Sequence, residues 1–116
     1  MTNPKKPTKK PTKKPTLVGR QVVVRSSQAG VFHGTLVSMS SDGQTVTLAN
    51  ASKLWRWYVA RMTGQLASVA EVAAYGVKRD PNARYSARVE SQIVTGCCEV
   101  LAVSEEAAPT FAEVIG

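Results

Sequence analysis

In the first half of the chain, apolar and polar residues alternate along three successive segments. These are residues 20–25, 31–39 and 44–49, and each is rich in valine or other β-branched residues. An alternation of period two is typical of strands with one buried face. The second and third segments are separated by residues 40–43, which end in Asp42-Gly43, a pair that tolerates positive φ and favours a hairpin. The pattern therefore predicts an antiparallel β-meander.

In the second half of the chain, segments with strand-like alternation are interrupted by a segment with helical spacing of apolar residues. After a predicted turn at residues 50–52, residues 53–59 read as a fourth extended segment, and residues 85–94 and 97–103 as later strands. Residues 64–75 have apolar positions three and four apart, which predicts a helix that Thr63 caps and Gly76 ends. Residues 104–106 are typical of a helix start, but proline disrupts a helix interior, so the C-terminal helix either consists of two turns separated at Pro109 or begins at Pro109.

These elements predict an α+β fold. We expect a small antiparallel β-meander or partly open barrel, with one middle helix and a short C-terminal helix. A single domain is expected, because about 100 residues bury enough surface for one modest core.

The positive charge is concentrated at the N-terminus. The chain has 15 basic and 8 acidic residues, and the first 16 residues contain no acid. Three tandem copies of Lys-Lys-Pro-Thr supply six lysines: Lys5, Lys6, Lys9, Lys10, Lys13 and Lys14. This composition has no apolar face to bury, and the prolines block a regular helix. We therefore predict a disordered basic arm over residues 1–17 and a β-rich globular domain over residues 18–116.

The arm is suited to polyanions. Regular lysine pairs can neutralise nucleic-acid phosphates, and the arm lacks the aromatic or amide side chains that read bases. We expect it to associate with DNA or RNA without sequence preference, and the alternative is a solubilising tail.

A second candidate site is the segment Trp55-Arg56-Trp57-Tyr58 together with Arg61. Indoles and guanidinium groups can stack on a base and hold a phosphate. Arg56, Trp57, Tyr58 and Arg61 are therefore candidate ligand-binding residues, with Arg84 and Arg88 as further partners. The competing interpretation, which we favour, puts Trp55 and Trp57 together on a core-facing side of the strand.

Catalytic chemistry has little support in this sequence. His33 is the single histidine, and we interpret it as a residue of a strand surface or edge. Cys97 and Cys98 are adjacent, and we expect two reduced cysteines without metal-ligand spacing. Gly30 and Gly34 fit a tight turn and a close strand approach better than a phosphate loop. We predict no catalytic residues, no metal and no cofactor, hence a protein that is not an enzyme.

The sequence also resembles a family of small, uncharacterised proteins of tailed bacteriophages and prophages. The resemblance lies in VVRSSQAGVFHGTLVS at residues 23–38, VTLANA at 46–51 and LWRW at 54–57, and extends over about residues 19–114. It implies a phage accessory protein and brings no established activity, cofactor or site residues. The family lacks the arm, and its members usually continue the last helix with lysines where this chain has Ala108-Pro109-Thr110.

Two function classes follow from the charge layout and the resemblance. The first is a non-enzymatic phage accessory protein that associates with nucleic acid through its arm, with a domain that forms a homo-oligomer or contacts partners. The second is a small-ligand binder that sequesters a nucleotide signal of bacterial anti-phage immunity. No apolar run approaches the roughly 18 residues of a membrane span, so we expect no membrane contact and a location in the host bacterial cytoplasm or in the virion.

Overall fold

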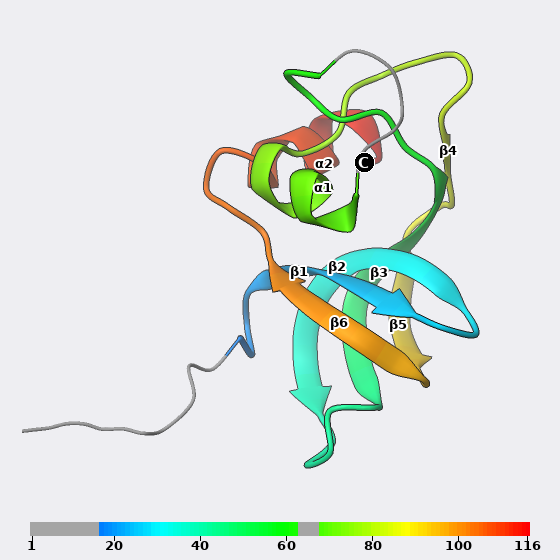
Figure 1. Cartoon of the computed structure of the whole chain (residues 1–116), viewed down its shortest axis with the longest axis vertical. Coiled ribbons are helices and arrows are strands. Elements are labelled where there is room, and N and C mark those ends of the chain that lie inside the picture. Colours follow the sequence, from blue (N-terminus) through cyan, green and yellow to red (C-terminus); the bar gives the residue numbers. More distant parts are fainter. Residues whose placement is uncertain (1–16, 63–67) are drawn as a thin grey trace, which may run out of the picture.

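The computed structural model describes residues 17–62 and 68–116. Within these ranges, the chain forms an α+β domain of six strands and two helices, as predicted (Figure 1). The strands are β1 (Gln21–Ser26), β2 (Gly30–Met39), β3 (Val46–Arg56), β4 (Arg84–Tyr85), β5 (Val89–Val94) and β6 (Cys97–Ala102). The helices are α1 (Val69–Tyr75) and α2 (Ala108–Val114).

The predicted meander is confirmed. β1, β2 and β3 pair antiparallel in chain order. The connection between β2 and β3 closes through Asp42, whose carboxylate accepts from Ser40 Oγ at 2.6 Å and from the Gln44 amide at 3.0 Å. Gly43 has φ 76°, which glycine adopts without strain. The Asp-Gly pair therefore acts as the sequence predicts.

The last two strands bend the sheet. The strand order is β4-β3-β2-β1-β6, and β5 also pairs with β3. Only Thr95 and Gly96 separate β5 from β6, although the two strands pair with β3 and β1 on opposite sides of β2. The Gly96 carbonyl accepts from the Ser27 amide at 3.1 Å, which fixes this connection. The sheet is consequently strongly curved, but it stays open.

Two local predictions about the sheet are wrong. Residues 50–52 do not form a turn, because β3 continues through them to Arg56. Ala51 pairs with Val89 of β5 and Ser52 with His33 of β2, so the chain keeps its strand partners while Asn50 takes a positive φ of 52°. Residues 85–94 are not one strand, since residues 86–88 separate β4 from β5, although both strands pair with β3 and the Ser86 amide still donates to the Lys53 carbonyl of β3 at 2.9 Å.

Helix α1 begins later than the sequence suggests, whereas α2 begins next to Pro109. The N-cap of α1 is Ser68 rather than Thr63, and Ser68 forms a capping box with Glu71. Residues 63–67 lie outside the described ranges. Gly76 ends α1 at φ 87°, as predicted. α2 starts at Ala108 with Pro109 in its first turn, which agrees with the predicted start near Pro109 and not with a start at Ser104.

The sheet buries apolar residues on both faces. We call the face turned away from the helices the inner face. Its buried cluster consists of strand residues only: Val22, Val24, Phe32, Leu36, Val46, Leu48, Ala51 and Val94. The helix face packs against α1 and α2, which Figure 1 shows together on one side of the sheet. Its cluster is Val23, Val31, Leu54, Val59, Val69, Val72, Ala73, Val77, Val103, Ala107 and Phe111. β1 therefore places three consecutive buried valines into two different clusters.

Candidate functional site

The six arm lysines lie outside the described residues, as does the rest of residues 1–16. The structure therefore leaves Lys5, Lys6, Lys9, Lys10, Lys13 and Lys14 as sequence-based candidates. The candidate sites among the described residues all lie in the folded domain.

The sequence-predicted segment after β3 spreads its side chains in different directions. Trp57 is half-buried and packs against the helix-face cluster, and Tyr58 is also half-buried. Arg56 and Arg61 are exposed. Arg61 Nε pairs with Glu106 Oε2 at 2.7 Å, and its guanidinium lies 5.5 Å from the centre of the Tyr75 ring.

These side chains do not converge on one cavity. Trp57 lines a cavity with Arg25, Val31, Glu99 and the start of α1, whereas Arg61 lines another with Met62, Glu71 and Tyr75. The chain turns between them, because Val59 bridges to Val77 and Arg61 has a positive φ of 74°. The sequence places Trp57 and Arg61 close together, but the turn separates their side chains.

Trp55 departs from the predicted alternation. It is 59% exposed, so it does not share a core-facing side with Trp57. The pairing of β3 with β4 shifts register between Leu54 and Arg56, and the extra residue at this bulge is Trp55. Lys53 Nζ lies 5.6 Å from the centre of the Trp55 ring, within the range of a cation–π contact.

Two exposed arginines follow this indole along the β3–β4 pair. Arg56 of β3 is directly opposite Arg84 of β4, and both side chains are exposed. The ion pairs among residues 17–62 and 68–116 are Arg25–Glu99 and Arg61–Glu106, so no carboxylate there forms an ion pair with these arginines. We call Lys53, Trp55, Arg56 and Arg84 the indole–cation surface. Sequence reasoning named Trp55, Arg56 and Arg84 but missed Lys53, and it favoured a core-facing Trp55, because the bulge in β3 leaves no signal in the alternation.

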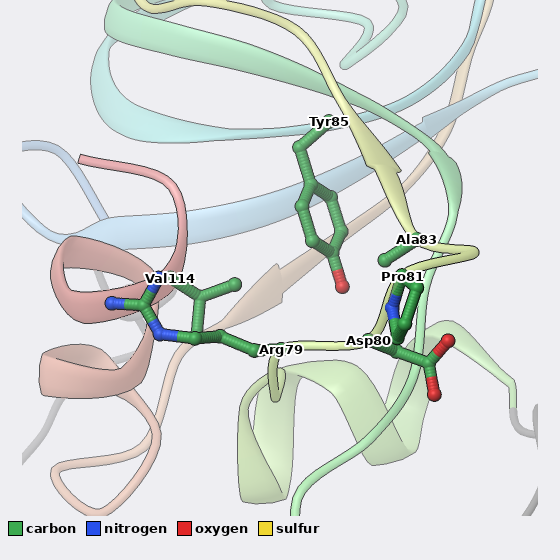
Figure 2. A pocket seen from close by; sticks show the side chains of 6 residues that line it. All are labelled: Arg79, Asp80, Pro81, Ala83, Tyr85 and Val114. Atoms are coloured by element: carbon green, nitrogen blue, oxygen red, sulfur yellow. The ribbon is translucent and has the colours of Figure 1, made fainter.

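A cavity of about 360 Å³ lies beside α2. It is lined by Arg79, Asp80, Pro81, Ala83, Tyr85 and Val114. Figure 2 shows the Tyr85 ring reaching between Val114 and Arg79 on one side and Pro81 and Ala83 on the other. The Tyr58 amide donates to the Tyr85 hydroxyl at 3.4 Å, and burial raises the pKa of that hydroxyl. Tyr85 is therefore a neutral phenol at pH 7.

A second cavity, of about 380 Å³, surrounds His33. The prediction that His33 is a surface or edge residue is wrong, because it is 2% exposed. β2 directs His33 to the helix face, where its ring stacks on Phe111 of α2 at 3.8 Å between centroids. No sequence pattern marks this contact, since Phe111 is 78 positions away and belongs to another element.

Two polar side chains fix the state of this histidine. Arg88 Nη1 lies 2.9 Å from His33 Nδ1, and Gln21 Oε1 lies 2.9 Å from His33 Nε2. Arg88 has donors only, so Nδ1 must accept and Nε2–H must donate to Gln21. Burial, followed by the charge of Arg88, lowers the pKa of His33 to about 3. His33 is therefore neutral at pH 7, with its proton on Nε2.

Two glycines and two cysteines complete the set of residues considered from the sequence. Gly30 has φ 103° as the first residue of β2, directly after the turn from β1, and a Cβ on Gly34 would lie 3.1 Å from the Ala49 carbonyl oxygen, so a tight turn and a close strand approach are confirmed. Cys97 and Cys98 are free thiols.

In the described part of the chain, no group of His, Cys, Asp and Glu is arranged to hold a metal. No helix in that part is long and apolar enough to cross a membrane.

A family model described as Domain of unknown function (DUF6948) matches residues 19–111, well over half of the chain. The chain belongs to the DUF6948 family. No curated protein matches the chain. The DUF6948 match begins after the lysine arm and includes His33, Trp55, Tyr85 and Arg88, but it ends before Val114.

Proposed function

We propose that this protein is a non-enzymatic phage accessory protein that associates with nucleic acid. In this proposal, the six arm lysines contact phosphates without sequence preference, the folded domain forms a homo-oligomer or contacts partners, and the protein works in the host bacterial cytoplasm or in the virion. The observation that carries the proposal is the separation of charge: residues 1–16 have six lysines and no acid, whereas the remainder has nine basic and eight acidic residues. Solubility alone requires no such periodic cationic segment.

The indole–cation surface supports the same function within the folded domain. An exposed indole next to lysine and arginine offers a stacking platform for a base beside cations that bind phosphates, which is the usual combination in single-strand binding. Trp55 is 59% exposed and has Lys53 Nζ at 5.6 Å, with Arg56 and Arg84 on the neighbouring strand pair. In this proposal, the arm supplies affinity for the backbone, and Trp55 adds a preference for single strands.

The salt dependence of binding tests the arm. Fluorescence anisotropy with random-sequence duplex DNA should give a slope of log K against log salt of about −5, because each phosphate contact contributes about −0.9. Replacing all six lysines with glutamine should nearly abolish binding. A shuffled arm of the same composition is the matched control and should bind as the native arm does. Equal binding by the glutamine variant would contradict the role of the arm.

The exposed indole is tested with single-stranded DNA and RNA. Trp55→Ala should weaken binding by about 1 to 3 kcal/mol, the usual contribution of one stacked base. Ile93→Ala is the matched control, because Ile93 is 65% exposed on β5 and has no place in the indole–cation surface. Unchanged single-strand binding by Trp55→Ala would leave the arm as the sole interface.

A second candidate function is a small-ligand binder that sequesters a nucleotide signal of anti-phage immunity. The observation that favours it is the cavity of Figure 2, which combines an aromatic ring and a guanidinium group in about 360 Å³. This volume is within the usual range of small-molecule sites. Native mass spectrometry of protein from infected-cell lysate should reveal a bound nucleotide that Arg79→Gln loses and Arg84→Gln retains. Recovery of nucleic acid alone would favour the first function.

A further inference from the structure

Strand β5 (Val89–Val94) lies at an open edge of the sheet. It pairs with β3, whose other side is occupied by β2. An edge strand directs the N–H and C=O groups of alternate residues outward, where they can pair with another strand. Among residues 17–62 and 68–116, no strand pairs with this outer side of β5, and no loop or side chain bonds its backbone groups. The row of donors and acceptors is therefore available to a partner.

The other edge strands carry features that discourage pairing. β4 continues the same edge as β5 but has only two residues. β6, at the opposite edge, changes register with β1 between Arg25 and Ser26, so this strand pair bulges there. β5 has neither feature, because its pairs with β3 run without a shift and its sequence contains no proline or lysine. A regular edge of this kind is a template for another strand.

β5 also exposes large apolar side chains at both of its ends. Val89 is 43% exposed and Ile93 is 65% exposed. Alternate side chains of a strand lie on one side, so these two share a side of β5 with Ser91, which is also exposed. Val94 lies on the other side, where it belongs to the inner-face cluster. One side of β5 therefore presents an apolar residue, a serine and an apolar residue to solvent.

The sequence of β5 is complementary to itself in an antiparallel pair. A two-fold axis through Ser91 places this residue opposite its own copy. In this register, Val89 of one copy lies opposite Ile93 of the other, so the exposed apolar side chains cover each other. Glu90, the one charged residue of the strand, lies opposite the neutral Gln92. No like charges meet, and every exposed apolar residue of β5 gains an apolar neighbour.

Other registers of the same pair are less favourable. An axis through Glu90 would place two carboxylates opposite one another, which destabilises a strand pair. An axis through Gln92 would place Ile93 opposite Ser91, and an axis between Ser91 and Gln92 would place Glu90 opposite Ile93. The charge and apolar pattern of β5 therefore fits a second copy of the chain in one register.

We propose that β5 is the contact surface of a homodimer, in which two copies pair their β5 strands antiparallel about a two-fold axis at Ser91 and join their sheets into one. The proposal rests on the proposed function only for its homo-oligomer, and it holds whether or not the arm binds nucleic acid. One short strand per copy is a small interface, so the dimer should dissociate on dilution. The anisotropy experiments use dilute protein, in which the monomer prevails.

The first test uses the full-length native protein without DNA or RNA. Sedimentation velocity over a concentration series measures self-association, and NMR over the same series locates it. We expect a reversible monomer–dimer equilibrium, with saturable shifts of the β5 amides as the concentration rises. A protein that stays monomeric up to its solubility limit would overturn the proposal, and so would a dimer that leaves the β5 amides unshifted. Neither result bears on the arm, so the two proposals fail separately.

An engineered disulfide tests the register. Ser91→Cys faces its own copy at the axis, and directly opposed residues of antiparallel strands are close enough for a disulfide. Cys97 and Cys98 are replaced with serine in every variant, because free thiols could cross-link by themselves. Glu90→Cys is the matched control, since it is exposed on the same strand but lies opposite Gln92.

Mild oxidation should convert several-fold more of the Ser91→Cys protein than of the Glu90→Cys protein into covalent dimers, as non-reducing electrophoresis measures. A mixture of Glu90→Cys and Gln92→Cys should also cross-link, because this register places the two positions opposite one another. Equal cross-linking of Ser91→Cys and Glu90→Cys would overturn the proposed pairing. Because the serine background could lose its fold, sedimentation and NMR of the native protein remain decisive by themselves.

Discussion

The two faces of the curved sheet differ in polarity. The inner face is enclosed by strands, and its buried cluster consists only of apolar residues. The helix face is apolar at its centre, but it also contains His33, which stacks on Phe111 and bonds Arg88 and Gln21. Among the described residues, the buried polar side chains are Ser26, His33 and Ser52, and of these His33 is the one that joins a helix to the sheet, through its stacking on Phe111. The candidate chemistry around His33 therefore lies where α2 meets the sheet.

The same contrast explains why each face tolerates change differently. An apolar cluster loses transfer and packing energy when a side chain is shortened. A cluster with a buried polar network also loses hydrogen-bond partners, and leaving a buried group unpaired costs additional free energy. Mutations on the helix face should consequently change pH dependence as well as stability, whereas mutations on the inner face should change stability alone.

The largest effect is expected from large-to-small changes in the two clusters. Phe111→Ala should lower the free energy of unfolding by about 3 to 5 kcal/mol, and Leu48→Ala on the inner face by about 2 to 5 kcal/mol. Urea unfolding at pH 7 measures both. In Phe111→Ala the His33 pKa should also rise, because the ring loses its cover, and NMR titration should detect this. An unchanged His33 pKa in that variant would contradict the stacking role of Phe111.

The next effect is the pH dependence that His33 confers. The folded-state pKa of about 3 lies below the ordinary value of 6.5, so the unfolded chain takes up a proton first as the pH falls. The contribution of neutral His33 to the free energy of unfolding is intact above about pH 6.5 and is lost progressively below it. The loss reaches about 2 kcal/mol between pH 7 and 5. Urea unfolding at several pH values checks this. His33→Gln cannot titrate, and its stability should vary less over the same window; an identical slope would exclude His33 as the cause.

A smaller effect is expected at the close approach of β2 and β3. Gly34→Ala would bring a Cβ to 3.1 Å from the Ala49 carbonyl oxygen and 3.2 Å from Leu48 Cβ. Backbone atoms cannot rotate away, so overpacking should cost about 1 to 3 kcal/mol of unfolding free energy. Ser38→Ala, on the exposed end of the same strand, is the control and should stay within about 0.5 kcal/mol. Thermal unfolding of both variants is sufficient, and a neutral Gly34→Ala would mean that the strands can separate there.

The smallest effect distinguishes the two indoles. Trp55→Ala should change stability by less than about 0.5 kcal/mol, because the side chain is mostly in solvent. Trp57→Ala should cost more, since Trp57 packs against the helix-face cluster. Denaturant unfolding of the pair compares them directly. Equal stability of the two variants would show that Trp57 is not part of the core.

Local patterns in the sequence determined much of this protein. Alternating apolar residues predicted β1, β2 and the start of β3, and Asp42-Gly43 predicted their hairpin, because strand period and turn chemistry are properties of neighbouring residues. The switch to helical spacing predicted α1 as well, and Gly76 marked its end. The charge of the arm is likewise a property of sequence alone.

Only the tertiary structure decided where the polar groups meet. β3 continues past Asn50 because β2 and β5 pair with it there, and Trp55 is exposed at a bulge opposite β4. His33 is buried because Phe111 covers it, and Arg88 reaches it from 55 positions away. Such contacts depend on how distant segments pack, and neither periodicity nor spacing records them. The sequence therefore predicts the strands and the arm, whereas the packing of α2 on the sheet creates the cavity around His33.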